Sequence, residues 1–258
     1  MRRPIGLRDY VIQATGDPDI FRQARSLGFD GVEVVSTREQ LSDPGRVRLG
    51  SLKKVKLETG IQVPSLSLSH HNQGGLVSPD EKTSEAAVDD VWHCFEWAEV
   101  LGVGIFLVPF FNEASLRNSD SRKRVVARLK PLCAEAERRG VILAYEGDLP
   151  AQGILELAAE IGSPAFGCYF DLANPLFHGL EPRQELEKLG PLVVSVHIKD
   201  FKEHLGDCRP GQGRVPLGAC ADLLRQMGYA GWLILETPPA SPEVVAGDLE
   251  FVKKVFGQ

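Results

Sequence analysis

The sequence is poor in the features that define several large classes of protein. Its 258 residues include five cysteines and no Cys-x-x-Cys pair, so neither a disulfide framework nor a structural zinc site is indicated. No apolar run approaches the ~20 residues of a membrane span, and the N-terminal segment has no long apolar core. We therefore expect a cytoplasmic protein with reduced thiols and no membrane partner.

Positive charge is also scarce. Lys and Arg together number 29 against 35 Asp and Glu, which gives a formal net charge of −6 at pH 7. A protein that follows the phosphates of nucleic acid usually carries the opposite balance. Nucleic acid is therefore not expected as a partner, although a local basic pocket for one small anion is compatible with this charge.

What the chain does contain is a repeated unit of helix, glycine and apolar strand. The helical segments 84–101 and 121–139, for example, have apolar residues three and four positions apart. Eight strands are predicted, at residues 4–8, 31–35, 61–69, 104–109, 141–146, 166–171, 193–198 and 232–236. Strands that alternate with helices predict a parallel α/β fold. A single (β/α)₈ TIM barrel over residues 1–258 is the expected solution, because the Gly-x-Gly-x-x-Gly turn of the alternative, an open doubly wound sheet, is missing.

Four consecutive strands in the second half each end on a side chain that can bind a divalent metal. These residues are Glu146, Asp171, His197 and Glu236, each preceded by an apolar run. A strand buried on both faces cannot solvate a charge in its middle, so we expect these groups where the strands emerge, at one face of a barrel. Three carboxylates and one imidazole suit Mn²⁺ or Mg²⁺, with Co²⁺ or Zn²⁺ as alternatives. The opposing interpretation is four separate polar residues, each capped by an amide or a Lys.

Other polar residues are candidates for contact with a substrate. His70 and His71 follow the third strand, and strand alternation leaves open which of them faces the site. Glu33 lies inside the second strand, where it could accept a hydrogen bond from a substrate or form a buried pair with Arg8 or Lys199.

Two further candidates lie on or after the seventh strand. Lys199 follows His197 by two residues, so both side chains point to one side if the strand persists; a solvated Lys is the alternative. Arg209 and Arg214 flank a Gly-rich loop that could bind a phosphate or a carboxylate, although plain loop flexibility is the favoured explanation of the glycines.

Three aromatic residues on one predicted helix are expected to serve packing. Trp92, Phe95 and Trp97 have helical spacing. A contact in a homo-oligomer is an alternative place for them.

At the strand ends the chain resembles the xylose-isomerase-like TIM-barrel superfamily of sugar isomerases and epimerases. The resemblance covers essentially the whole chain, and its most specific motifs are Tyr-Glu146-Gly, Asp171-Leu-Ala-Asn174, His197-Ile-Lys199-Asp200 and Leu-Glu236-Thr. It implies that Glu146, Asp171, His197 and Glu236 bind one divalent metal, and that Glu146 and Glu236 also exchange protons with the substrate. Many ketose epimerases of the family carry a substrate-binding His where Asn174 stands here.

The resemblance implies a metal-dependent epimerase or isomerase of a ketose, a ketose phosphate or a related polyol-derived ketone, working by proton transfer through an enediolate. A metal-dependent dehydratase of the inosose or dehydroshikimate type is the alternative, since relatives use the same ligands. A phosphodiesterase like the family's apurinic DNA endonucleases is less expected. Those enzymes hold three metals with several extra His and Asp ligands, and here Phe110 and Asn174 stand near positions where such ligands are expected. A non-catalytic sugar-binding protein is disfavoured, because both proton-transfer glutamates are present.

Overall fold

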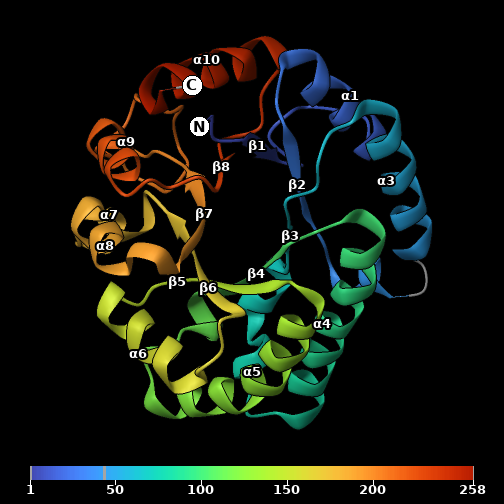
Figure 1. Ribbon diagram of the computed structural model, residues 1–258, viewed down its shortest axis with the longest axis vertical. Coiled ribbons are helices and arrows are strands. Elements are labelled where there is room, and N and C mark those ends of the chain that lie inside the picture. The colour runs from blue at the N-terminus through green and yellow to red at the C-terminus, as the bar shows by residue number, and fades with distance from the viewer. Residues whose placement is uncertain (1, 43–44, 258) are drawn as a thin grey trace. The chain divides into compact units, whose positions relative to one another are not determined.

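The computed structural model describes residues 2–42 and 45–257, and its eight strands form a closed parallel barrel in the order β1 to β8 (Figure 1). This confirms the predicted (β/α)₈ TIM barrel. The strands are β1 Ile5–Arg8, β2 Gly31–Val35, β3 Ser65–Ser67, β4 Ile105–Phe110, β5 Ile142–Gly147, β6 Phe166–Asp171, β7 Val193–Ile198 and β8 Trp232–Leu235.

The segments between the strands carry the helices. The α-helices are α1 Asp17–Leu27, α2 Arg38–Leu41, α3 Gly45–Thr59, α4 Glu81–Leu101, α5 Ser119–Arg139, α6 Ala151–Ile161, α7 Asn174–Phe177, α8 Pro182–Leu189, α9 Leu217–Gln226 and α10 Pro242–Phe256. Short 3₁₀ turns are η1 Ser69–Gln73, η2 Gly75–Val77, η3 Asn112–Ala114 and η4 Gly190–Leu192. Helices α4 and α5 begin slightly before their predicted starts, because the side chains of Asp80 and Asn118 cap their first backbone amides.

Glycine ends the two longest helices, as the sequence predicts. Gly102 and Gly140 both have φ of 66° and donate their backbone N–H to carbonyls of the preceding turn. This left-handed conformation carries no steric cost for glycine. Each glycine therefore stops a helix and turns the chain toward the next strand.

The third strand is shorter than predicted. The sequence indicates residues 61–69, whereas β3 covers Ser65–Ser67. Pro64, directly before β3, has no N–H to donate to a neighbouring strand. Gln62, two residues before Pro64, forms only an isolated bridge with Gly31. From Ser69 onward the chain turns into η1, which changes where His70 and His71 point.

The described residues group into two compact units. One lies within Met1–Glu33, Val55–Gln62 and Phe170–Gln258, and the other within Val34–Lys54 and Val63–Tyr169. In the first, α10 packs against α9 and α1; in the second, α5 packs against α4 and α6 (Figure 1).

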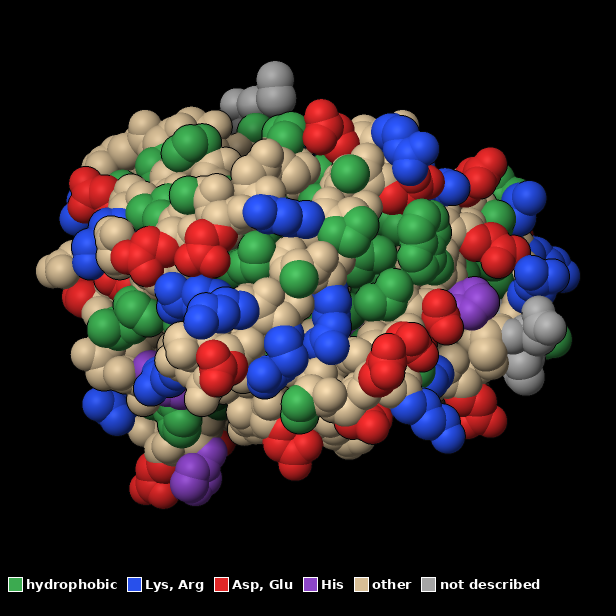
Figure 2. All heavy atoms as spheres, turned by 90° about the horizontal axis from the view of Figure 1, so that it is seen from below, with side chains coloured by type: hydrophobic (Ala, Val, Ile, Leu, Met, Phe, Trp, Pro, Cys, Tyr) green, Lys and Arg blue, Asp and Glu red, His purple; other side chains and the backbone are tan. Residues whose placement is uncertain are grey.

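Figure 2 shows acidic and basic side chains interspersed over one face of the molecule. Among the described residues, no helix combines the length and the apolar character that crossing a membrane requires.

Candidate metal centre

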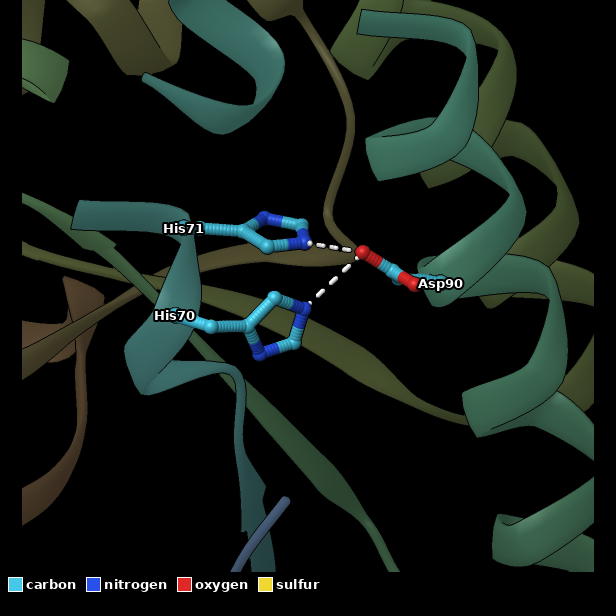
Figure 3. Close-up of side chains that lie close together, drawn as sticks. All are labelled: His70, His71 and Asp90. Carbon is cyan, nitrogen blue, oxygen red and sulfur yellow. Dashed lines mark hydrogen bonds and ion pairs between the residues drawn. The ribbon is translucent and has the colours of Figure 1, made fainter. Parts of the chain in front are cut away.

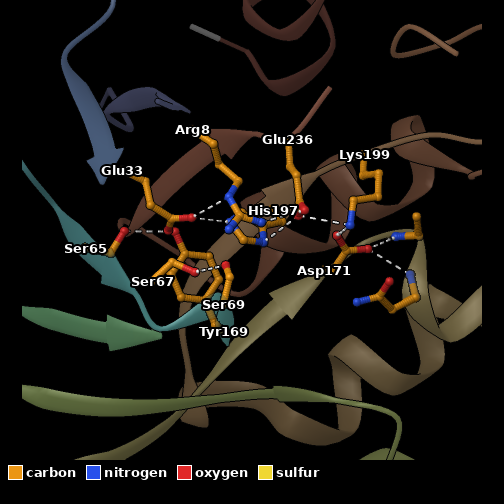
Figure 4. Close-up of polar contacts among 12 residues, drawn as sticks. Arg8, Glu33, Ser65, Ser67, Ser69, Tyr169, Asp171, His197, Lys199 and Glu236 are labelled. Carbon is orange, nitrogen blue, oxygen red and sulfur yellow. Dashed lines mark hydrogen bonds and ion pairs between the residues drawn. The ribbon is translucent and has the colours of Figure 1, made fainter. Parts of the chain in front are cut away.

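Three of the four predicted metal ligands come together in the first unit (Figure 4). Asp171 is the last residue of β6, His197 lies near the end of β7, and Glu236 directly follows β8. Each offers a ligand atom, and these atoms lie within 4.8 Å of one another. The carboxyl ends of neighbouring parallel strands thus bring together residues that are far apart in the sequence.

The carboxylate of Asp171 is held by the turn that follows β6. Its Oδ1 atom accepts hydrogen bonds from the backbone N–H groups of Ala173 at 2.7 Å and Asn174 at 2.8 Å. Its Oδ2 atom lies 3.2 Å from Nζ of Lys199. One oxygen is therefore fixed by the backbone, while the other faces the centre of the cluster.

The two carboxylate oxygens of Glu236 also have different partners. Oε1 accepts hydrogen bonds from Nη1 of Arg8 at 2.6 Å and from the hydroxyl of Tyr10 at 3.2 Å. Oε2 lies 3.0 Å from Nδ1 of His197 and 3.0 Å from Nζ of Lys199. The carboxylate is thereby clamped on one side and faces the cluster on the other.

The charges around Glu236 favour its ionised form. Burial by itself would raise the pKa of the Glu236 carboxyl, but the positive charges of Lys199 and Arg8 outweigh burial and hold the pKa well below its usual range. Burial, and then the charge of Glu236, raise the pKa of the Tyr10 hydroxyl. Tyr10 therefore stays protonated and donates a hydrogen bond to the carboxylate of Glu236, which stays anionic.

The imidazole of His197 is oriented by Glu33. Nε2 of His197 lies 3.1 Å from Oε1 of Glu33, and Nε of Arg8 lies 3.1 Å from the same oxygen. Both ring nitrogens therefore face a carboxylate: Nε2 faces that of Glu33, and Nδ1 faces that of Glu236 and is the atom directed at the cluster. Histidine ligands of metals are commonly held in one tautomer by such an outer carboxylate.

The cluster fits a small, hard cation. Oδ2 of Asp171 and Oε2 of Glu236 are buried oxygens that point into the cluster. Both face the same ammonium group, that of Lys199. With Glu33 included, three carboxylates stand against two cations, Arg8 and Lys199. The excess is negative, and oxygen atoms that converge on one cation are the arrangement that Mg²⁺ and Mn²⁺ prefer.

Glu146, the fourth predicted ligand, belongs to the second unit. It is buried near the end of β5, one residue after Tyr145, which pairs with Cys168 of β6. Burial, and then the charge of Glu146, raise the pKa of the Cys168 thiol. The sequence predicted this position at the end of a strand. A carboxylate that is buried there needs partners that compensate its charge.

His70 and His71 lie on η1 rather than on a strand. Both rings direct Nε2 at Oδ2 of Asp90 in α4, at 2.9 Å and 3.1 Å (Figure 3). Strand alternation therefore does not decide which one faces the site, because both turn to the same helix. Contact with a substrate stays a prediction for either residue.

The other predicted substrate contacts have partners within the protein. Glu33 pairs with Arg8, one of the alternatives that the sequence offered. Asn174 is buried at the start of α7. Arg209 donates to the carbonyl of Pro238 at 2.8 Å and its Nη2 lies 3.2 Å from Oδ2 of Asp248. These contacts give Arg209 a role in holding the chain after β8, and its binding of a substrate stays a prediction.

Sequence reasoning missed part of this cluster. Arg8 was expected only as a possible partner of Glu33, and its contact with Glu236 was not predicted. It ends β1 after buried apolar residues, so the rule that selected the four predicted ligands could have placed it at the site. Tyr10 lies in the loop after β1 and carries no comparable signal. Its contact with Glu236 joins residues 226 positions apart.

The fold and this cluster define a parallel β/α-barrel protein with a candidate metal centre at the carboxyl ends of its strands. Residues 21–255 match the model of the xylose isomerase-like TIM barrel family. The chain belongs to this family.

Relatives that are more than 30% identical to this chain include two epimerases with different substrates in their names. L-ribulose-5-phosphate 3-epimerase from Shigella flexneri is 32% identical over 229 residues, which cover 83% of this chain and 80% of the relative. 2-Epi-5-epi-valiolone 7-phosphate 2-epimerase from Actinoplanes is 31% identical over 205 residues, which cover 76% of this chain and 72% of the relative.

Solved structures of low sequence identity share the fold. 3-Keto-D-glucoside 4-epimerase from E. coli superposes with a TM-score of 0.81 at 19% identity and covers 98% of this chain and 100% of its own. D-allulose 3-epimerase from Methylomonas, in complex with D-allulose, gives a TM-score of 0.82 at 17% identity and covers 98% and 97%. At these identities the likeness supports the fold alone.

Proposed function

We propose that this protein is a divalent-metal-dependent epimerase that acts on a ketose phosphate. The observation that carries the proposal is the cluster of Asp171, His197 and Glu236, in which two buried carboxylate oxygens and one imidazole nitrogen converge. The two relatives described above are both named as epimerases. The site chemistry and the kinship point to the same reaction class.

The proposed ligand set is Glu146, Asp171, His197 and Glu236. Charge supports the inclusion of Glu146. Without it, the acids near the site exceed the cations by one; with it, they exceed them by two. A buried excess of two negative charges is costly unless a cation compensates it, and a dication does so completely.

The reaction proposed for this site is removal and return of a proton on a carbon next to a carbonyl. When bound, the metal supplies Lewis-acid stabilisation of the negative charge that develops on the substrate oxygens. Glu236 is anionic at rest, so its first act is to accept a proton. Glu146, on the opposite side of the substrate, returns a proton to the other face of the same carbon, which inverts it.

Neighbouring residues support these two steps. Arg8 and Tyr10 hold Oε1 of Glu236 and restrict the carboxylate to one orientation. The positive charge of Lys199 lies beside Oε2 of Glu236. There it can stabilise the negative charge that develops on the substrate as an enediolate forms.

The proposed substrate class is a phosphorylated ketose or polyol-derived ketone. Both relatives described above are named for a phosphorylated substrate. The unphosphorylated sugar is the natural comparison, because the two differ only in the group that lies away from the reacting carbon.

The test is deuterium exchange followed by NMR in D₂O with Mn²⁺ added at substoichiometric concentration relative to substrate. We expect L-ribulose 5-phosphate to incorporate deuterium next to its carbonyl and to give an epimer, faster than L-ribulose does. The Glu236→Gln variant, loaded with metal, is the control and should lose this exchange. An unsaturated product would replace the proposal with the dehydratase alternative. No exchange across ketoses, their phosphates and inososes would contradict enolisation chemistry altogether.

A further inference from the structure

A second cluster of metal-binding side chains lies in the other unit, at the helix α4. The turn η1 supplies His70 and His71, and α4 supplies Asp90 (Figure 3). Both Nε2 atoms approach a single oxygen, Oδ2 of Asp90, at 2.9 Å and 3.1 Å. Ligands that share one ion at ~2.1 Å lie about 3.0–3.4 Å apart for angles between 90° and 110°, so little movement separates this arrangement from a three-ligand site.

The two imidazole rings are fixed before any ion arrives. Nδ1 of His70 lies 3.0 Å from the carbonyl oxygen of Ser36, which can only accept, so Nδ1 carries a hydrogen and Nε2 is aimed at Asp90. An imidazole whose outer N–H binds a backbone carbonyl is the usual state of a metal ligand. His71 is buried, and the backbone of Gly75 packs directly against it, since a Cβ at Gly75 would lie 2.9 Å from Cβ of His71.

The Nδ1 atom of His71 is buried without a hydrogen-bond partner among the described residues. Nε2 faces the acceptor Oδ2 of Asp90, so this nitrogen carries the hydrogen before an ion binds. On Nδ1, by contrast, the hydrogen would meet no competing partner. The tautomer with hydrogen on Nδ1 leaves a lone pair on Nε2, directed at the place where His70 and Asp90 meet.

Arg38 already occupies the other side of the carboxylate. Its Nη2 lies 2.9 Å from Oδ2 of Asp90, and its Nε lies 3.2 Å from Oδ1. The side chain of Asp90 is 2% exposed, whereas that of Arg38 is 48% exposed. The guanidinium can therefore move into solvent, while the carboxylate and the two imidazoles stay in place.

We propose that His70, His71 and Asp90 form a second site, for a transition-metal dication, and that Arg38 competes with the ion for Asp90. Two imidazoles and one carboxylate select borderline ions such as Zn²⁺, Co²⁺ or Ni²⁺ over Mg²⁺. When the ion binds, the Nε2 hydrogen of His70 leaves as a proton, because Nδ1 of this ring already carries one. His71 takes the tautomer with hydrogen on Nδ1, which frees its Nε2, and Arg38 keeps at most one oxygen of Asp90. The site belongs to a different group of residues from the proposed catalytic centre and does not depend on it.

Titration with Co²⁺ tests the proposal, because visible absorption reports imidazole ligands and equilibrium dialysis reports stoichiometry. We expect Arg38→Gln to bind two ions per chain, with a dissociation constant for the second ion at least ~10-fold below that of the wild type, since a competing unit charge has been removed. Arg46→Gln is the matched control: it removes the same charge from another exposed arginine that pairs with α4, through Glu96. It should leave the second constant unchanged.

His70→Gln should abolish the second binding event in the Arg38→Gln background, and Asp171→Asn should weaken only the other one. A single ion per chain in Arg38→Gln would overturn the proposal, as would a second ion that survives His70→Gln. If that double variant does not fold, the side-chain nitrogen NMR signals of His70 and His71 in Arg38→Gln decide: they shift on addition of Zn²⁺ if the site exists, and unchanged signals refute it.

Discussion

Replacing Glu33 with Gln tests whether an outer carboxylate sets the metal affinity of the proposed catalytic centre. Glu33 is fully buried, and one of its oxygens faces both Nε2 of His197 and Nε of Arg8 at 3.1 Å. Gln keeps the shape and one acceptor but removes the negative charge. The imidazole then loses the negative charge that favours hydrogen on Nε2 and increases the basicity of Nδ1.

The expected loss follows from this geometry. Outer carboxylates of metal-bound histidines contribute about 10- to 100-fold in metal affinity, which corresponds to ~1.4–2.7 kcal/mol. Removing one partner of a buried ion pair typically costs about 3–5 kcal/mol of stability. Arg8 retains Glu236 as a partner, so we expect a stability loss at or below the low end of that range.

The assay is calorimetric titration of metal-stripped protein with Mn²⁺, with thermal unfolding of the metal-free protein recorded in parallel. Glu187→Gln is the matched control, since Glu187 is exposed and pairs only loosely with Arg183, at 3.8 Å. A folded Glu33→Gln protein that binds Mn²⁺ within about twofold of the wild type would refute the positioning role. A lower melting temperature with unchanged affinity would assign Glu33 to stability alone.

Three further predictions address the candidate centre and one of its loops. Glu146→Gln and Glu236→Gln should each retain some metal and lose at least ~10²-fold in turnover, because an amide cannot accept a proton at neutral pH; near-wild-type rates in a metal-loaded variant would exclude the proton-transfer role. Chelation should abolish activity, and Asp171→Ala should lower metal content measured by mass spectrometry; full occupancy would contradict its role as a ligand. Backbone N–H groups of residues 202–204 lower the pKa of Asp207 to about 2, so this turn is stabilised at neutral pH and should loosen as the pH falls from about 4 to 2. Hydrogen exchange at those amides checks this, and Asp207→Asn should already exchange faster at pH 7.

The fold was predictable because the repeated pattern of helix, glycine and strand has one common solution at this length. The positions of Asp171, His197 and Glu236 were predictable for a related reason: a charge after a buried strand has to emerge at the strand's end. Their partners were not. The contact between Glu33 and His197 joins residues 164 positions apart, and no local pattern relates them.

The histidines after β3 show where strand logic fails. Alternation asks which of His70 and His71 faces inward, but this question assumes that the strand continues, and β3 ends at Ser67. In the 3₁₀ turn that follows, successive side chains are about 120° apart rather than opposite, so both rings can reach α4. The sequence did contain one clue, since Asp90 lies among the apolar residues that α4 buries. A carboxylate in that position needs donors, but only the folded chain identifies them as His70, His71 and Arg38.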